Sequence, residues 1–409
     1  MAITFISHGR SEAEVEQAGA DLVRTRLVER LKGPEQRVRV DDLLPAAADW
    51  RWTLNVWMAE CDVAVVLVTR GGMDKPWLKR EVNILLWRLA LGAPLTVLPV
   101  LLGGLQPRDL RKTEISQLVT RQMIIQGVEE SEEDLVDRIV AALGDLPRCA
   151  DTSAMQSMAA KVEHCLDEVK QAFPLQEMAR ELGGRQQPFP EIREGRRFIA
   201  YQFLDERPTE VVPKAIKKVA FYLDPDRLEK LINLAVPTWI DPVAVRRLLP
   251  EDGQVVVTLG TERSDTARQH IDRASCFSDD YWVQVVALVA GEAQLAENLI
   301  ACERAVGELF GGDVDTEPPD DDVLFLVIDP HGTEPGVAGE LVRELTARFS
   351  RLNVVVLTGD AGPEDLGEQH CRTLHIAVPP GTEDGVAQTV KALKRIFARR
   401  KDLGKDLGQ

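Results

Sequence analysis

Residues 62–90 read DVAVVLVTRGGMDKPWLKREVNILLWRLA, and this stretch decides the expected fold of the amino-terminal part of the chain. It contains a largely apolar and β-branched run at 62–68, which is typical of a strand buried on both faces. A loop with two glycines follows, and the apolar residues of about 74–90 then have helical spacing. A buried strand, a short loop and an amphipathic helix form half of a parallel βαβ unit.

The same alternation of strand and helix extends through residues 1–147. Further strands are expected in four apolar runs and helices between the strands: strands at 3–7, 37–40, 94–101 and 122–126, and helices at about 11–31, 50–60, 74–90, 107–118 and 131–144. This alternation predicts a parallel sheet covered by helices on both faces. Five strands in this length fit a flavodoxin-like α/β fold with strand order 2-1-3-4-5.

The remainder of the chain changes character twice. Residues 148–240 lack strand patterns and carry short helical patterns separated by prolines, so a small helical bundle is expected there. Residues 241–409 return to alternating strands and helices, which predicts a second α/β domain. The expected organisation is therefore three domains, at 1–147, 148–240 and 241–409.

Composition limits the classes of function. The chain has 409 residues and a net charge of −17, which argues against direct binding of nucleic acid. Its six cysteines are scattered singly, without a C-x-x-C pair, as is typical of a reducing compartment. Because no run of 18 apolar residues and no secretory leader is recognisable, we expect a cytoplasmic protein without a membrane span. Zinc-ligand spacing is absent, so no metal is expected.

In a sheet of order 2-1-3-4-5, ligands bind at the carboxyl ends of the first and third strands. The loops there are residues 7–10 (SHGR) and 69–72 (TRGG). Each loop carries glycine, which allows close approach of the backbone, and an arginine suited to phosphate. A ligand site is therefore predicted between these two loops.

Glu81 stands out on the helix that follows the second loop. Its neighbours one turn away are Trp77, Leu78, Ile84 and Leu85, and all four are apolar. Partly desolvating a carboxylate is costly unless a partner or a reaction uses it. The pattern leaves two interpretations, an active-site carboxylate or an ion pair with a nearby lysine or arginine.

These features resemble a TIR domain over residues 1–147. The resemblance rests on Phe5-Ile6-Ser7, on residues 40–45 (VDDLLP) with Trp50, on the third strand, and on Trp77-x-x-x-Glu81. It implies that Glu81 is the catalytic glutamate of an NAD⁺ glycohydrolase, with NAD⁺ as substrate and no cofactor. The candidate substrate-binding residues are Ser7, His8, Arg10, Asp42, Trp50, Arg70 and Trp77.

The chemistry fits that role, because breaking the nicotinamide–ribose bond builds an oxocarbenium-like cation. A carboxylate about 4 Å away stabilises such a cation by roughly 4 kcal/mol at an effective dielectric of about 20. Two loops differ from the family pattern, with His8-Gly9 in place of an aromatic residue and Ala46–Ala48 in place of a glycine after Pro45. Trp50 also fits an apolar stripe on its helix together with Leu54, Trp57 and Cys61, and this pattern favours a place in the hydrophobic core.

The other segments carry two further resemblances. Residues 148–240 resemble the small effector-associated domains of bacterial conflict proteins. Residues 241–409 resemble a STAND-type NTPase, a Rossmann- or P-loop-like fold, with a degenerate nucleotide site. Counting from Gly260, a P-loop needs glycine, lysine and a hydroxyl where this chain has Asp265, Thr266 and Ala267. The strand that ends at Asp329 resembles a Walker B strand.

These resemblances imply a TIR NAD⁺ hydrolase effector of a bacterial immune or conflict system. TIR domains would self-associate, and residues 148–409 would sense a partner protein, so that assembly switches the enzyme on. Whether the product is linear or cyclised ADP-ribose stays open. Two alternatives remain, a non-catalytic TIR signalling scaffold and a TIR effector fused to a cyclic-oligonucleotide sensor similar to SAVED domains.

Overall fold

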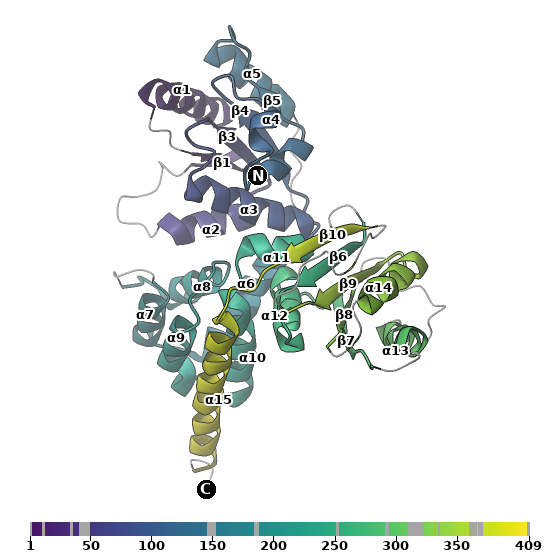
Figure 1. Ribbon diagram of the computed structural model, residues 1–409. Coiled ribbons are helices and arrows are strands. Elements are labelled where there is room, and N and C mark those ends of the chain that lie inside the picture. Colours follow the sequence, from purple (N-terminus) through teal and green to yellow (C-terminus); the bar gives the residue numbers. More distant parts are fainter. Residues whose placement is uncertain are drawn as a thin grey trace. The chain divides into compact units, whose positions relative to one another are not determined.

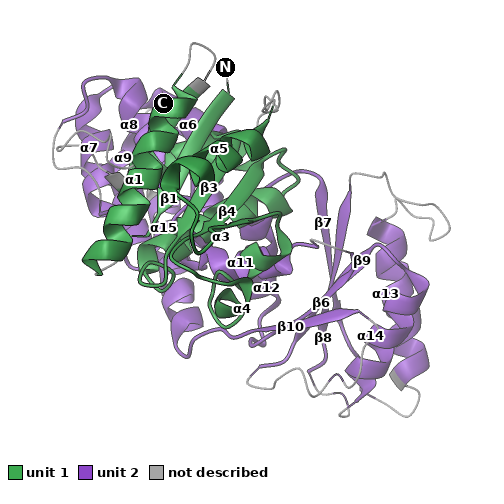
Figure 2. Cartoon of the chain, turned by 90° about the horizontal axis from the view of Figure 1, so that it is seen from above, with its two compact units in different colours: residues 1–159 green, residues 160–409 purple. Residues whose placement is uncertain are grey.

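The computed structural model describes most of the chain in two compact units, Met1–Ala159 and Ala160–Gln409 (Figure 2). The described residues are 2–9, 13–32, 36–40, 50–144, 153–183, 188–250, 253–290, 294–309, 322–331, 333, 336–359, 366 and 371–406. Among the helices of these residues, none combines the length and the apolar character needed to cross a bilayer.

The first unit is built on a parallel sheet with the strand order β2-β1-β3-β4-β5, so the predicted order is confirmed. Its strands are β1 (Ala2–His8), β2 (Gln36–Val40), β3 (Val63–Val68), β4 (Thr96–Leu101) and β5 (Ile124–Ile125). Its helices are α1 (Glu14–Leu31), α2 (Trp50–Glu60), α3 (Pro76–Ala90), α4 (Pro107–Leu110) and α5 (Glu132–Leu143). The helix expected at 107–118 is shorter, because it ends at Leu110 and a 3₁₀ turn, η2 (Ser116–Thr120), follows.

Helices cover both faces of this sheet. Apolar residues of α1 and α5, such as Leu27 and Val136, pack on Ile6, Val65 and Leu67. Helices α2 and α3 lie on the opposite face (Figure 1). Every residue of β3 is fully buried, as its apolar run predicts for a central strand.

The second unit holds a parallel sheet with the order β10-β6-β9-β8-β7. Its strands are β6 (Val255–Leu259), β7 (Tyr281–Ala287), β8 (Val323–Asp329), β9 (Leu352–Leu357) and β10 (Arg372–Ile376). Helices α13 (Gln294–Leu309) and α14 (Val337–Arg348) cover one face, and α12 (Ser264–Ala274) lies on the other (Figure 2). This order differs from the 3-2-1-4-5-6 order of dinucleotide-binding folds.

The rest of the second unit is helical. Its helices are α7 (Ala172–Glu181), α8 (Ile192–Gln202), α9 (Val211–Val219), α10 (Pro225–Ala235) and α11 (Pro242–Leu248), with the 3₁₀ turns η3 (Leu166–Glu168), η4 (Ala220–Tyr222) and η5 (Val236–Trp239), while α6 (Ala154–Cys165) crosses the boundary between the units. The carboxyl-terminal helix α15 (Thr382–Asp406) packs on α9 and α10, so the last helix of the chain adds to this bundle.

Candidate active site

Glu81 lies on the buried side of α3, beside the end of β1. Its side chain is only 1% exposed, and Leu78, Ile84 and Leu85 around it are fully buried. The hydroxyl of Ser7, the last residue but one of β1, donates a hydrogen bond to Oε2 of Glu81. The apolar stripe predicted from the sequence therefore accompanies a buried carboxylate, and Ser7 is one of its hydrogen-bond partners.

His8, the last residue of β1, is held by α1. Its Nε2 atom lies 2.8 Å from Nη1 of Arg24, and the guanidinium also pairs with Asp21 at 3.1 Å. Because arginine can only donate, Nε2 of His8 must accept, and the neutral ring carries its hydrogen on Nδ1. Ser7 and His8 are consecutive in β1, so their side chains lie on opposite faces of the sheet, Ser7 towards α3 and His8 towards α1.

The two loops of the predicted ligand site touch each other through glycine. A Cβ added to Gly9 would lie 2.7 Å from the carbonyl oxygen of Gly72, and one added to Gly72 would lie 2.6 Å from that of Gly9. These distances are too short for any side chain at either position. The close backbone approach expected from the glycines therefore joins the two loops directly.

The β3–α3 loop also binds a carboxylate of the chain itself. The backbone amides of Arg70 and Gly71 each donate to the side chain of Glu16 on α1, at 3.0 Å. The side chain of Arg70 pairs with Asp109 at 3.5 Å. Two adjacent amides that converge on one carboxylate form a small anion-binding nest.

A cavity of about 740 Å³ opens beside this nest. Its lining residues come from α1 and from the loops that follow β3, β4 and β5: Ala13, Val15, Glu16, Gly19, Ala20, Arg70, Gly71, Lys75, Leu102, Gly103, Gln126 and Glu132. Ser7, His8 and Glu81 are not among them. The cavity lies at the predicted edge of the sheet, on the side of α1, whereas the buried acid lies on the side of α3.

The other predicted site residues lie away from this pair or outside the described residues. Trp77, near the start of α3, is half-buried, and the guanidinium of Arg80 lies 5.2 Å from its ring centre. Arg80 also donates to Asn55 on α2 at 2.7 Å. Arg10 and Asp42 lie outside the described residues, as does the side chain of Trp50. The structure therefore brings Ser7 and Glu81 together on the α3 side of the sheet, whereas His8 lies against α1 and Arg70 lines the cavity.

Sequence reasoning missed Glu16, Arg24 and Lys75. Glu16 lies in the first turn of α1, where acidic residues are common because they favour the positive end of the helix dipole. Nothing in its spacing indicates that it reaches the loop after β3. Contacts of this kind depend on how α1 packs against the sheet.

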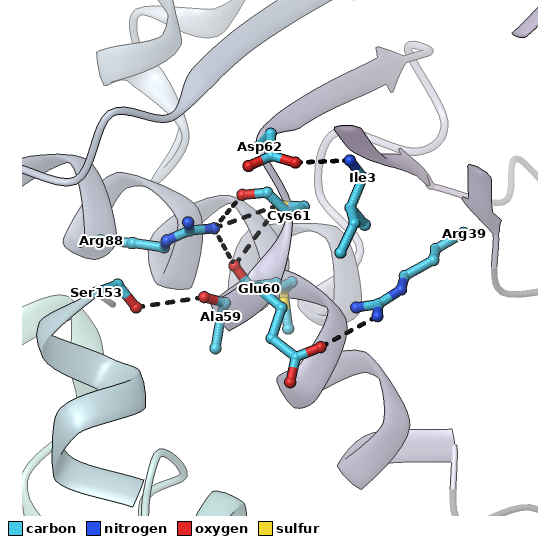
Figure 3. Close-up of polar contacts among 9 residues, drawn as sticks. Ile3, Arg39, Ala59, Glu60, Cys61, Asp62, Arg88 and Ser153 are labelled. Carbon is cyan, nitrogen blue, oxygen red and sulfur yellow. Dashed lines mark hydrogen bonds and ion pairs between the residues drawn. The ribbon is translucent and has the colours of Figure 1, made fainter. Parts of the chain in front are cut away.

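The opposite end of the sheet is also polar, but its contacts stabilise the fold (Figure 3). The guanidinium of Arg88 on α3 donates to the carbonyl oxygens of Met58 and Cys61, and so closes the end of α2. Asp62 accepts from the amide of Ile3 at 2.6 Å. Burial raises the pKa of the Cys61 thiol to about 11, which makes it a poor nucleophile.

In the second unit, an acidic side chain lies at the amino end of α12. Glu383 on α15 accepts hydrogen bonds from the hydroxyls of Thr261 and Thr266, the latter at 2.6 Å. Gly260 precedes this turn, where a Cβ would lie 3.1 Å from the carbonyl oxygen of Gly359. A carboxylate of the chain therefore lies against the turn between β6 and the amino end of α12.

A cavity of about 540 Å³ lies between α12 and α15. Four cationic side chains line it, Arg263, Lys391, Lys394 and Arg395, together with the acidic Asp265 and Glu383 and an apolar strip of α15. Lys391, Lys394 and Arg395 follow each other at helical spacing and are exposed. This local positive charge contrasts with the net charge of −17 of the whole chain.

No family model matches this chain, and no curated protein matches it.

Proposed function

We propose that the first unit is an NAD⁺ glycohydrolase in which Glu81 stabilises the cation that forms on the ribose. The observation that supports this is the Ser7–Glu81 pair, a desolvated carboxylate at the carboxyl end of β1. A carboxylate in such surroundings interacts strongly with a cation, and about 4 kcal/mol of stabilisation corresponds to roughly a thousandfold in rate.

The described conformation would be the resting state of this enzyme. Glu81 is almost fully buried and lies outside the lining of the nearby cavity, so a ribose must reach it through a rearrangement of the loops after β1 and β3. We propose that self-association of the first unit drives this change and that the second unit responds to a partner protein of a bacterial conflict system. NAD⁺ would be the substrate, with no cofactor.

The test is nicotinamide release from NAD⁺ by the full chain, dilute and under enforced assembly. Assembly is imposed by a crowding agent or by fusion to an oligomerising peptide. We expect release to rise with assembly, to be lost in Glu81→Ala and to persist in Glu133→Ala, which alters an exposed acid of the same unit. Release that survives Glu81→Ala would remove this residue from the mechanism.

A non-catalytic scaffold is the second candidate for the first unit. The burial of Glu81 and its hydrogen bond from Ser7 favour it, because a buried polar pair also fixes the packing of α3 on β1. Self-association without nicotinamide release in any state of assembly would support the scaffold over the enzyme.

For the second unit we propose a sensor module that does not bind nucleotide triphosphate at α12. Glu383 places negative charge against the turn that would have to accept phosphate. Adding ATP with Mg²⁺ should therefore leave the thermal unfolding temperature of the chain unchanged.

The cationic cavity between α12 and α15 favours one specific alternative, a sensor of cyclic oligonucleotides. A thermal-shift panel of cyclic di-, tri- and tetranucleotides tests it. Stabilisation that Lys394→Glu abolishes would support this alternative, and no shift with any member of the panel would remove it.

A further inference from the structure

The outer edge of β7 differs from every other sheet edge in the described residues. The edge strand β2 carries Arg37 and Arg39, and β10 carries Arg372 and His375. The edge strand β5 has only two residues. Charges and short length are the usual means by which proteins prevent edge strands from pairing with other chains. By contrast, β7 is seven residues long, reads YWVQVVA and contains no charge or proline.

The backbone groups on this edge can be identified from the pairing with β8. The carbonyl oxygen of Asp280 and the amide of Leu288 both bond β8, so the even-numbered residues of β7 face β8. The odd-numbered residues between Tyr281 and Ala287 therefore direct their N–H and C=O groups outward. Among the described residues, β7 pairs with β8 alone, which leaves four donors and four acceptors on the edge.

Exposed apolar side chains accompany this edge. Trp282 is 49% exposed and Val285 is 40% exposed. Val289, just beyond the strand, and Ile300 on the adjacent α13 are also exposed. Figure 1 shows β7 at the end of the second sheet farthest from β10. An uncharged edge with this composition is a template for adding another strand.

We propose that β7 pairs antiparallel with β7 of a second copy of this chain, which joins two sheets across a two-fold axis at Gln284. This register sets Val283 opposite Val285 of the second copy and Tyr281 opposite Ala287. Both are hydrogen-bonded pairs, so every outward donor and acceptor of both strands is used. Gln284 meets its own counterpart as a non-hydrogen-bonded pair, and a glutamine side chain can both donate and accept there.

In this register the edge complements itself, which favours a second copy as the occupant. In this register Asp280 lies opposite Leu288 of the second copy, so no two like charges face each other. A foreign acidic or basic strand would gain nothing from an edge that carries no charge. The proposed pairing does not depend on the chemistry of the first unit.

Disulfide formation tests the register in the full chain. Cα atoms of a non-hydrogen-bonded antiparallel pair are about 4.5 Å apart, within the range of a disulfide. Gln284→Cys should therefore form a covalent dimer under mild oxidation. Trp282→Cys should not, because its two copies would be about 14 Å apart along the paired strands. The unsubstituted chain gives the background from native cysteines.

A second variant tests the edge itself. Val285→Pro removes an outward N–H and no bond to β8, so β7 stays in its sheet. Introduced into Gln284→Cys, it should abolish the covalent dimer, whereas Phe173→Lys, at an exposed apolar residue of α7, should not. Absence of the Gln284→Cys dimer, or its persistence with Val285→Pro, would overturn the proposal. Neither result depends on NAD⁺ cleavage, so this inference and the proposed function can fail separately.

Discussion

At the scale of single residues, the central contact is the hydrogen bond that the hydroxyl of Ser7 donates to Glu81. The carboxylate is buried among leucine and isoleucine side chains of its own helix, and the serine hydroxyl donates to it from β1. A hydrogen bond to a charged group contributes more than one between neutral groups, and it also orients the acceptor. This pair therefore stabilises the first unit and positions the candidate catalytic acid.

Replacing Ser7 with alanine should lower the free energy of unfolding of the first unit by about 2 kcal/mol, because a buried carboxylate loses a donor. Ser116→Ala, at the start of η2, should change it by no more than about 0.5 kcal/mol. Urea denaturation followed by fluorescence measures both. Equal stability of the two variants would mean that the Ser7–Glu81 contact does not form in solution.

The parts of this site that could be predicted are those that depend on residues close together in the sequence. The burial of Glu81 was predictable, because Leu78, Ile84 and Leu85 lie one turn away on the same helix. Its pairing with Ser7 spans 74 positions of sequence, and only the parallel arrangement of β1 and β3 brings α3 to that strand. The contact of Glu16 with the loop after β3 had no sequence signal for the same reason.

At the scale of secondary-structure elements, the boundary between α2 and β3 is closed by one arginine. The guanidinium of Arg88 satisfies carbonyl oxygens of Met58 and Cys61 at the carboxyl end of α2 (Figure 3). Helix ends leave such carbonyls without partners inside the helix. Arg88 is itself fully buried, so α3 holds α2 through a contact that water does not reach.

We expect Arg88→Met to destabilise the first unit by about 3 kcal/mol, since it leaves buried carbonyl oxygens without a donor. Arg108→Met removes a charge from an exposed position on α4 and should have little effect. Thermal unfolding followed by circular dichroism compares the two. A melting temperature unchanged in Arg88→Met would contradict the capping role.

Helix α12 contains a buried histidine that makes the stability of the second unit depend on pH. Nδ1 of His270 lies 2.8 Å from the carbonyl oxygen of Thr266 and so donates to it. Burial lowers the pKa of His270 to about 4, from an ordinary value of 6.5. The neutral ring is therefore favoured in the folded chain, while the unfolded chain takes up a proton at higher pH.

The stability contributed by neutral His270 should be fully present above about pH 6.5 and be lost as pH falls towards about 4, by about 3 kcal/mol in total. In His270→Gln this component is absent. The difference in free energy of unfolding between the natural chain and the variant should therefore shrink over that range, measured by urea denaturation at several pH values. A difference that stays constant would contradict the assignment.

The elements themselves were largely predictable, because apolar periodicity is a local property. The expected helices at 50–60 and 264–274 coincide with α2 and α12, and the strand expected at 62–68 differs from β3 by one residue. The short helix α11 was missed, although Asp241 caps it and Pro242 opens it, since seven residues give too little periodicity. The packing of α15 on α9 and α10 joins distant parts of the chain, and no local pattern encodes it.

At the scale of the whole molecule, the two units use the carboxyl ends of their sheets differently. In the first, a buried acid lies on the α3 side of the sheet, and a cavity with an amide nest lies on the α1 side; in the second, Glu383 accepts hydrogen bonds at the turn before α12. From this contrast we propose different roles for the two units. In this proposal the first unit would carry out the reaction. The second unit, which has the uncharged edge strand β7 and the cationic cavity, would control assembly and signal recognition.

The most direct measurement is the rate of nicotinamide release from NAD⁺ by the assembled chain and by its Glu81→Gln variant, followed by mass spectrometry. Glutamine keeps the shape of the side chain and can still accept from Ser7, so it isolates the negative charge. The account predicts that release by the assembled natural chain falls by roughly a thousandfold in the variant while folding is retained. Equal release by both proteins, or none from the assembled natural chain, would contradict it.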